Sequence, residues 1–214
     1  MEHIINNTNG SGIFIQIGAG AGDLDSRSNY QDGFAKLIKG LPKERVKKII
    51  LVEPNPINIP FLLKAYENYD NVYIYEIAII PKNQPQEFFD FYLCEEDGPH
   101  YQVASLNKQH IIKHYGENAK IQTISVKTCS LENFLYTSCK DENIELLSLD
   151  IEGLDKEILC DVDLKYVNSQ FISFEYIHIN SVDLQMIHNK LNLFNYNHIG
   201  IGVDVNGYDL LYKK

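Results

Sequence analysis

Three glycines in the stretch GIFIQIGAGAGD, residues 12–23, have the spacing of a ligand-binding loop. The apolar residues before them predict a buried strand that ends where the glycines begin. Gly18, Gly20 and Gly22 stand at every second position, so the backbone there is able to adopt positive φ and to approach a ligand without a Cβ atom in the way. In parallel α/β sheets the first strand-to-helix turn is the usual ligand cradle. We therefore expect a cofactor site at this loop.

The spacing of the loop separates two kinds of cofactor. A dinucleotide fingerprint reads G-x-G-x-x-G, but here the third glycine comes one residue early and Asp23 takes the place of the motif's last glycine. A carboxylate beside a pyrophosphate would be repelled. The pattern resembles instead the first motif of class I methyltransferases, whose cofactor, S-adenosylmethionine, carries a sulfonium and an ammonium group that Asp23 suits. The acid usual two positions before the first glycine is here Gln16. A plain glycine turn is the alternative.

A second polar position follows the next predicted strand, in KKIILVEP. An acid at the end of this strand, here Glu53 followed by Pro54, accepts hydrogen bonds from ribose hydroxyls in nucleotide-binding α/β domains. Residues at the end of the third apolar run, among them Ala78 and Ile79, would then flank an adenine ring. The alternative is that Glu53 only caps the helix that follows.

Carboxylates and a histidine follow two later strands. ELLSLDIEG runs into Asp150 and Glu152, with Asp155 beyond, and FISFEYIHI carries Glu175 and His178. Parallel strands end at the same sheet edge, so these side chains are expected near the glycine loop, with Asp150 and Glu152 on one strand face. We predict Asp150 as the first candidate for general base, His178 as the second, and Glu175 beside them. In the alternative, Asp150 and Asp155 cap a helix and His178 is a core histidine.

The order of these motifs is that of one family. The segments FIQIGAGAGD, LVEPNP, EIAI, VKTCSLENFL, LLSLDIEGLDKEIL and ISFEY together resemble the FkbM family of S-adenosylmethionine-dependent methyltransferases, from Gly12 to about Ile179. The chain departs from the family by Ser148, where a lysine is common, and by Asp155, where glutamate is usual. The resemblance implies an α/β fold with a doubly wound, mostly parallel seven-stranded sheet, Rossmann-like, and an antiparallel C-terminal hairpin.

The resemblance also implies a reaction. It is O-methylation of a small-molecule or glycan acceptor, such as a sugar hydroxyl in the biosynthesis of bacterial surface polysaccharide (capsule or lipopolysaccharide). A phosphoryl or phosphoramidate-type oxygen on such a glycan precursor is an alternative acceptor. From the residues alone, two other classes stay open: a nicotinamide-dependent oxidoreductase, which would share the loop and Glu53, and a non-catalytic binding domain of a heteromeric enzyme.

Two patterns are candidates for metal binding. Asp150, Glu152 and Glu175 offer the carboxylates that hard divalent cations prefer, but many methyltransferases of this fold need no metal, and we expect none. His110 and His114 have the i, i+4 spacing of zinc ligands without the glutamate of the metalloprotease motif, so we expect surface histidines. The four cysteines form no C-x-x-C pair, which indicates neither a zinc nor a redox site.

Length and composition limit the number of domains, the kinds of partner and the cellular location that we expect. A length of 214 residues predicts one domain, residues 1–214. The net charge of −10 argues against a nucleic-acid partner. No apolar run approaches the length that spans a bilayer, and the first residues lack a signal-like apolar segment, so we expect a soluble, cytoplasmic protein without a membrane partner. The oligomeric state stays open.

Around these motifs, strands alternate with helices as in a doubly wound sheet. A polar segment at residues 94–105 is expected to lie over the sheet edge as a substrate lid. The Asn206-Gly207 pair predicts the turn of the closing hairpin. The predicted strands cover 12–17, 47–54, 71–80, 86–93, 121–127, 145–150, 169–179, 196–205 and 208–213, and the predicted helices cover 33–41, 108–115, 130–135 and 184–194.

Overall fold

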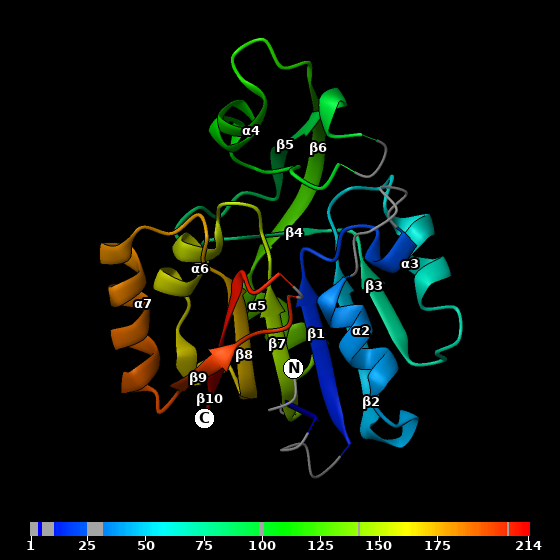
Figure 1. Cartoon of the computed structure of the whole chain (residues 1–214), viewed down its shortest axis with the longest axis vertical. Helices are drawn as coiled ribbons and strands as arrows, with labels where there is room; N and C mark the ends of the chain where they lie inside the picture. Colours follow the sequence, from blue (N-terminus) through cyan, green and yellow to red (C-terminus); the bar gives the residue numbers. More distant parts are fainter. Residues whose placement is uncertain (1–3, 6–10, 25–31, 99–100, 141, 205) are drawn as a thin grey trace.

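The computed structural model describes residues 4–5, 11–24, 32–98, 101–140, 142–204 and 206–214. Strands alternate with helices along most of the chain (Figure 1). The strands are β1 Gly12–Ile17, β2 Val46–Val52, β3 Val72–Tyr75, β4 Ala78–Ile80, β5 Phe88–Cys94, β6 Ile121–Ser130, β7 Ile144–Leu149, β8 Ser169–Glu175, β9 Asn197–Ile201 and β10 Asp209–Lys213. The α-helices are α2 Gly33–Gly40, α3 Ile59–Ala65, α4 Lys108–Tyr115, α5 Leu131–Ser138, α6 Asp155–Asp161 and α7 Ser181–Leu193.

The main sheet has seven strands in the order β3-β2-β1-β7-β8-β10-β9. Neighbours from β3 to β8 run parallel, whereas β10 pairs antiparallel with both β8 and β9. The strand order reverses between β1 and β7, and ligands of open α/β sheets bind outside the carboxyl ends of the strands at such a point. The predicted fold class, a mostly parallel doubly wound sheet closed by an antiparallel hairpin, is confirmed.

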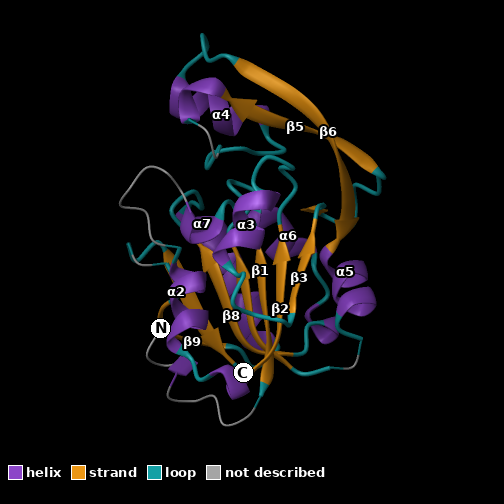
Figure 2. Cartoon of the chain, turned by 90° about the vertical axis from the view of Figure 1, so that its right-hand side faces the viewer, coloured by secondary structure: helices purple, strands orange, loops and turns teal. Residues whose placement is uncertain are grey.

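Two hydrophobic cores, one on each face of the sheet, explain the near-continuous apolar character of β1. Ile13, Ile15 and Ile17 pack with residues of α5, α6 and α7, whereas Phe14 packs with residues of α2 and α3. The helices therefore lie on opposite faces of the sheet, as Figure 2 shows for α2 and α5. Since side chains alternate along a strand, Gln16 faces the same side as Phe14, toward α2.

A second sheet, with the order β4-β6-β5, carries α4. Together β5, β6 and α4 form an arm beyond the carboxyl ends of the main strands (Figures 1 and 2). The single strand predicted over residues 71–80 is wrong, because β3 ends at Tyr75 and β4 pairs with β6 in the second sheet. β6 is longer than predicted and continues to Ser130, whose side chain caps α5 as expected.

The C-terminal hairpin has shorter strands than predicted. β9 ends at Ile201, and the side chain of Asp204 accepts hydrogen bonds from the backbone N–H groups of Asn206 and Tyr208. These bonds fold residues 202–204 into the turn instead of the strand. Asn206-Gly207 lies in this turn as expected. Among the helices of the described residues, none combines the length and the apolar character that crossing a bilayer requires.

Candidate active site

The glycine loop is fastened between the two strands that flank β1. The N–H groups of Gly18 and Ala19 donate to the carbonyl of Val52 at 2.9 and 3.0 Å, and the N–H of Asp150 donates to the carbonyl of Ile17 at 2.9 Å. Gly18 has φ +80°, and a Cβ atom there would lie 1.7 Å from the carbonyl oxygen of Asp150. Only glycine fits such a close approach of two backbones. Gly20, at φ +52°, has open space where its Cβ would be.

Glu53 lies directly behind this loop. Its Oε2 accepts from the N–H of Gly20 at 2.7 Å, and its Oε1 accepts from the N–H of Asn55 at 2.9 Å and from Nδ2 of Asn58 at 3.4 Å. Burial raises the pKa of this carboxyl group to about 7, although these hydrogen bonds oppose the rise. The N-cap of α3 is Asn58, so Glu53 is not the cap of that helix.

Gln16 is joined to a carboxylate that the sequence analysis missed. Its Nε2 donates to Oδ2 of Asp32 at 2.9 Å, and Oδ1 of Asp32 accepts from the N–H of Ala35 at 2.7 Å as the N-cap of α2. Burial raises the pKa of the Asp32 carboxyl group, against the effect of these hydrogen bonds. A carboxylate thus reaches the end of β1 from the start of α2, beside the position where the motif usually has its acid.

Asp23 does not take part in this arrangement. Its carboxylate forms an ion pair with Lys39 of α2, and it is not among the residues that line the cavity described below. Gly22, at φ +61°, turns the chain into a short 3-10 helix that begins there, and Asp23 follows on its outer side. The predicted contact of Asp23 with the cofactor has no support in this geometry.

The acids after β7 lie close to one another, and Asp155 is buried while Asp150 and Glu152 are half-buried. Asp150 Oδ1 has no hydrogen-bond partner, and burial together with the neighbouring carboxylates raises the pKa of Asp150 well above its usual range. Glu152 has φ +43°, so the strand geometry that would put it on one face with Asp150 has ended before this residue. Asp155 accepts from the N–H of Ile151 at 3.3 Å, and the N-cap of α6 is Leu154. The alternative in which Asp150 and Asp155 cap the helix is therefore wrong.

Glu175 and His178 follow β8 and face the same place. Burial raises the pKa of Glu175 to about 9, with further contributions from the carboxylates of Glu152 and Asp155. Burial lowers the pKa of His178 to about 4, and the imidazoles of His110 and His114 add to this effect. The imidazole of His178 is consequently neutral at neutral pH.

The two histidines of α4 reach this region from the arm. His110 is 5% exposed, and its Nε2 lies 3.0 Å from Oε2 of Glu152. His114 is exposed, but its ring lies 5.4 Å from that of His178 between centroids. The prediction of surface histidines is wrong for His110, because the arm folds α4 back over the loop that follows β7.

One cavity of about 300 Å³ brings the predicted site together. Residues 101–105 of the predicted lid, and Leu106 after it, also line the cavity, whereas residues 99–100 of this lid lie outside the described part of the chain. The predicted cofactor and catalytic residues that line the cavity are Gln16, Gly18, Gly20, Gly22, Glu53, Pro54, Ala78, Ile79, Asp150, Glu175 and His178.

Acids outnumber all other ionisable residues in the otherwise largely apolar lining. Among the described residues around this cavity there is no lysine or arginine. A ligand that carries positive charge is therefore favoured over an anionic one. The carboxylates are Asp32, Glu53, Asp150, Glu152, Glu175, Asp204 and Asp209.

Comparison with protein families decides the class of this site. A family model described as the methyltransferase FkbM domain matches residues 16–198, which is most of the chain. The chain belongs to the FkbM methyltransferase family. The FkbM domain is a methyltransferase whose cofactor is S-adenosylmethionine, as the sequence motifs predicted. The oxidoreductase alternative is set aside by this membership, since hydride transfer is not the chemistry of a methyltransferase.

Solved structures similar to this FkbM domain are distant. The fibrillarin pre-rRNA processing protein of Methanococcus jannaschii shares 12% identity at a TM-score of 0.43, over 95% of this chain and 66% of that one. The fibrillarin of Aeropyrum pernix, crystallised with S-adenosyl-L-methionine, shares 10% at 0.46, over the same fractions. The precorrin-6y C5,15-methyltransferase of Geobacter metallireducens shares 13% at 0.46, over 100% and 85%. The chain thus spans slightly less than two thirds of each fibrillarin. No curated protein sequence matches the chain.

The FkbM site has the donor and acceptor pattern that S-adenosylmethionine requires. Four buried oxygen atoms of lining residues lack a hydrogen-bond partner within the described structure, and all four are acceptors: Gln16 Oε1, Asn58 Oδ1, Asp150 Oδ1 and Glu175 Oε2. The cofactor offers an ammonium group and two ribose hydroxyls as donors, and its sulfonium suits the acidic lining. Asp32 and Asn58 were missed by the sequence analysis; an Asp or Asn immediately before a helical stripe is the one signal that marks them.

Proposed function

We propose that this chain transfers the methyl group of S-adenosylmethionine to a hydroxyl oxygen of an uncharged small-molecule or glycan acceptor. The observation that carries this proposal is the acidic cavity, which joins a cofactor loop to a group of carboxylates and imidazoles and has no lysine or arginine among its described lining residues. Carboxylates and neutral imidazoles accept hydrogen bonds from hydroxyl groups and can accept their protons.

The contacts around the loop support one orientation of the cofactor. Gln16 Oε1 and the Asp32 carboxylate would receive the ammonium group, because both lie at the end of β1 on the α2 side. Glu53 already accepts from three protein donors, so it would take one ribose hydroxyl while Asn58 Oδ1 takes the other. Ala78 and Ile79 would flank the adenine. This orientation directs the methionine end toward Asp150.

The transfer itself needs alignment and removal of one proton. S-adenosylmethionine supplies an electrophilic methyl group on a positively charged sulfur. With the cofactor bound, Asp150 would take the proton of the acceptor hydroxyl as its oxygen bonds to the methyl carbon, and the electron pair of the broken carbon–sulfur bond would stay on the cofactor's sulfur. The positive charge of the cofactor next to Asp150 favours the ionised carboxylate that acts as base, which burial alone disfavours. His178 is the second candidate, with a neutral imidazole that has an open acceptor nitrogen.

The acceptor follows from charge and from the family resemblance. A phosphoryl or phosphoramidate-type oxygen would bring negative charge against the carboxylates of the lining, which disfavours that alternative. A sugar hydroxyl avoids this repulsion, and a glycan of a bacterial surface polysaccharide is the proposed source. The four cysteines are free thiols, which supports a reducing compartment such as the cytoplasm for this reaction.

A labelled-methyl assay tests the proposal. The full chain is incubated with S-[methyl-³H]adenosylmethionine and either neutral oligosaccharides or matched phosphorylated ones, and the product is analysed by mass spectrometry. We expect an alkali-stable methyl ether on the neutral acceptors. Asp150→Asn is expected to lower kcat by about 10²- to 10⁴-fold, the usual contribution of a general base. Its affinity for the cofactor, measured by calorimetry, should change much less.

Three outcomes would contradict the proposal. Failure of the native chain to bind S-adenosylmethionine would remove the enzyme from consideration and favour the non-catalytic binding domain. Methyl transfer confined to phosphorylated acceptors would contradict the assignment of an uncharged acceptor. Full turnover by Asp150→Asn would show that this residue is not the base.

A further inference from the structure

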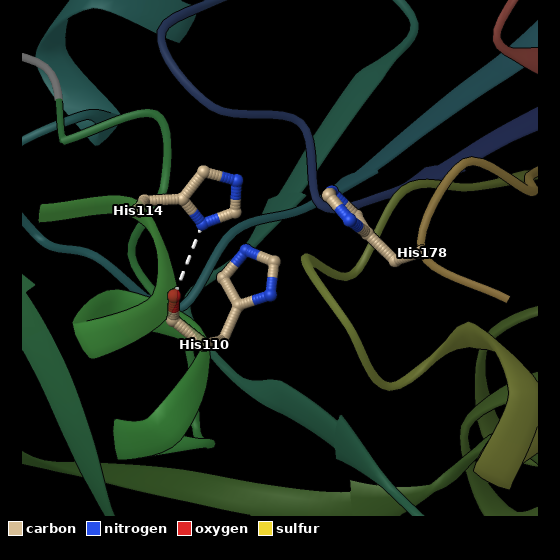
Figure 3. Close-up of side chains that lie close together, drawn as sticks. All are labelled: His110, His114 and His178. Carbon is tan, nitrogen blue, oxygen red and sulfur yellow. Dashed lines mark hydrogen bonds between the residues drawn. The ribbon is translucent and has the colours of Figure 1, made fainter. Parts of the chain in front are cut away.

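Five metal-ligating side chains from three separate segments meet at the acceptor end of the cavity. His110, His114 and His178 have ligand atoms that all lie within 4.8 Å of one another, and so do Glu152, Glu175 and His178. Figure 3 shows the three imidazoles turned toward one another, two from α4 and one from the segment after β8. His178 belongs to both groups. Asp150, which the carboxylate metal site of the sequence analysis included, belongs to neither.

The hydrogen bonds around the histidines leave ligand nitrogens available. Nδ1 of His114 lies 3.0 Å from the carbonyl oxygen of His110, so this nitrogen carries the proton and Nε2 keeps a free lone pair (Figure 3). A bond from one ring nitrogen to a backbone carbonyl is the usual way in which a metal-binding histidine is oriented. The centroids of the His110 and His178 rings are 4.8 Å apart at an interplanar angle of 89°. The rings thus meet edge to face.

The carboxylates of the group lack the positive charge that buried acids require. Oε2 of Glu175 is buried without a hydrogen-bond partner and lies 3.7 Å from Nε2 of His178. No lysine or arginine is found among the described residues that line this cavity. Buried carboxylates are expected to be paired with a cation or to coordinate a metal.

Backbone geometry brings Glu152 to this place at a conformational cost. Glu152 has φ +43°, a left-handed conformation that costs a non-glycine residue of this kind roughly 1 to 2 kcal/mol. The next residue, Gly153, has φ +90°, and a Cβ there would lie 2.7 Å from Nδ1 of His110. The tight turn presses the loop after β7 against α4. Strain of this kind is kept where the position of a side chain matters.

We propose that His110, His114, His178, Glu152 and Glu175 form a binding site for one divalent transition-metal ion, with His178 as the ligand common to both groups. Three imidazoles favour Zn²⁺, Fe²⁺, Co²⁺ or Mn²⁺ over Mg²⁺ and Ca²⁺, which prefer oxygen ligands alone. A catalytic ion that keeps one coordination position open is usually bound by fewer than five protein ligands. One or two of these five side chains therefore act as hydrogen-bond partners of the ligands and not as ligands themselves.

The location of the metal site within the cavity indicates how the ion would take part in methyl transfer. His114, His178, Glu152 and Glu175 line the same cavity as the glycine loop, so an ion there faces the space next to the methyl group. It would bind the acceptor hydroxyl and lower the pKa of that hydroxyl, which assists the removal of its proton. This role rests on the proposed function, whereas binding of the ion does not.

Direct metal titration tests the site without an activity assay. The full chain is treated with EDTA, desalted and titrated with Co²⁺, whose visible absorption reports imidazole ligands, and with Zn²⁺ by calorimetry. We expect one equivalent of either ion to bind, and millimolar Mg²⁺ not to displace it. His178→Ala is expected to weaken binding by at least about 100-fold, the upper part of the range for loss of a ligand-shell residue. Glu175→Gln, a conservative change of shape, should weaken it by about tenfold.

A second histidine pair provides the matched control. The rings of His188 and His198 lie 5.9 Å apart on α7 and β9, away from the cavity lining. His198→Ala should leave Co²⁺ binding unchanged. Absence of stoichiometric binding by the native chain, or equal binding by native protein and by both site variants, would overturn the proposal. Loss of binding in His198→Ala instead would assign the ion to the pair of His188 and His198.

Cofactor binding measured on the same samples separates this proposal from the proposed function. Native protein and His178→Ala should both bind S-adenosylmethionine, which also shows that the variant is folded. Cofactor binding without metal binding would overturn the metal site alone. Metal binding without cofactor binding would overturn the proposed function alone. Full methyl transfer by the EDTA-treated protein would contradict the role given to the ion.

Discussion

The two halves of the cavity differ in how their polar groups are paired. In the cofactor half, around β1 and β2, the carboxylates of Glu53 and Asp32 accept three and two hydrogen bonds from the protein. In the acceptor half, after β7 and β8, carboxylate oxygens of Asp150 and Glu175 are buried without any partner in the described structure. The unpaired atoms of the cofactor half belong to neutral amides, Gln16 and Asn58.

Because their polar groups are paired differently, the two halves of the cavity require different properties of their ligands. An unpaired amide oxygen costs far less than an unpaired buried charge, so the cofactor half keeps its shape before the ligand arrives. The acceptor half concentrates negative charge that only a cation, a proton or a donor-rich ligand compensates. The cofactor half is thus preorganised for its ligand, whereas the acceptor half needs a ligand that compensates its negative charge.

The largest effect is expected from the glycines of the cofactor half. Gly18→Ala would place a Cβ 1.7 Å from the carbonyl oxygen of Asp150 at φ +80°, and we expect it to lower the unfolding free energy by about 3 kcal/mol or more. Gly20→Ala meets no atom within 4 Å, so it should cost only about 1 to 2 kcal/mol of backbone strain. Urea denaturation measures both. Equal losses would show that the loop is not fastened as described.

The pH dependence of cofactor binding should report the ionisation of Glu53, which is already held in place by hydrogen bonds. Its pKa is raised to about 7, and the ionised form accepts the ribose hydroxyl, so binding releases a proton below this pH. Affinity for S-adenosylmethionine should therefore rise with pH up to about 7 and then level off, with a loss of roughly tenfold at one pH unit below 7. Calorimetry across this range should give a flat profile for Glu53→Gln. A flat native profile would contradict the assignment.

Two aspartates near the glycine loop test whether the geometry or the sequence motif identifies the contact of the cofactor's ammonium group. Asp32 lies beside Gln16 in the cavity, whereas Asp23 is paired with Lys39 outside the lining. Asp32→Asn keeps the cap of α2 and should weaken cofactor binding by about tenfold, the value of one charge-assisted contact of about 1.4 kcal/mol. Asp23→Ala should change it by less than about twofold. The reverse ranking would restore the ammonium contact to Asp23.

The smallest effect concerns stability in the acceptor half. The pKa of Glu175 is raised to about 9, so at neutral pH the folded protein keeps this carboxyl group protonated, whereas the unfolded chain ionises it. Glu175→Gln removes this cost, so at pH 7 the unfolding free energy of the metal-free variant should be about 1 kcal/mol higher than that of the native protein, while its methyl transfer is reduced. Urea denaturation in EDTA measures this gain. Glu142→Gln, which removes an exposed carboxylate paired with Lys47, is the control and should give no gain. A destabilised Glu175→Gln would show that this carboxylate is already compensated.

Local patterns account for what the sequence predicted well. The glycine loop, Glu53 and the acids after β7 each follow an apolar strand, so their structural positions can be predicted from a few neighbouring residues. The family resemblance, with the alternation of strands and helices, predicted the doubly wound sheet but not the order of its strands. Asp23 was predicted at the cofactor because its spacing matched a motif, but it does not line the cavity, whereas the carboxylate of Asp32 reaches the end of β1 from the N-cap of α2.

Contacts between distant segments account for what the sequence did not reveal. Residues 71–80 form a largely apolar run interrupted by Glu76, and this one polar residue did not reveal that β4 leaves the main sheet to pair with β6. His110 looks like a surface residue on a short helix, and it becomes buried only because α4 folds back onto Glu152. Such burial depends on the packing of the whole arm.

The pairing of β4 with β6 has a consequence for how the family can diversify. The chain leaves the core at β4 and returns through β6, and Ala78 and Ile80 lie opposite Thr128 and Ser130. Departure and return are therefore neighbours in space, the arrangement in which an inserted segment is best tolerated. Everything between them can be lengthened, shortened or exchanged without altering the register of the seven-stranded sheet. If the acceptor contacts this segment as proposed, grafting it between homologues should change acceptor preference while the seven-stranded sheet keeps its register.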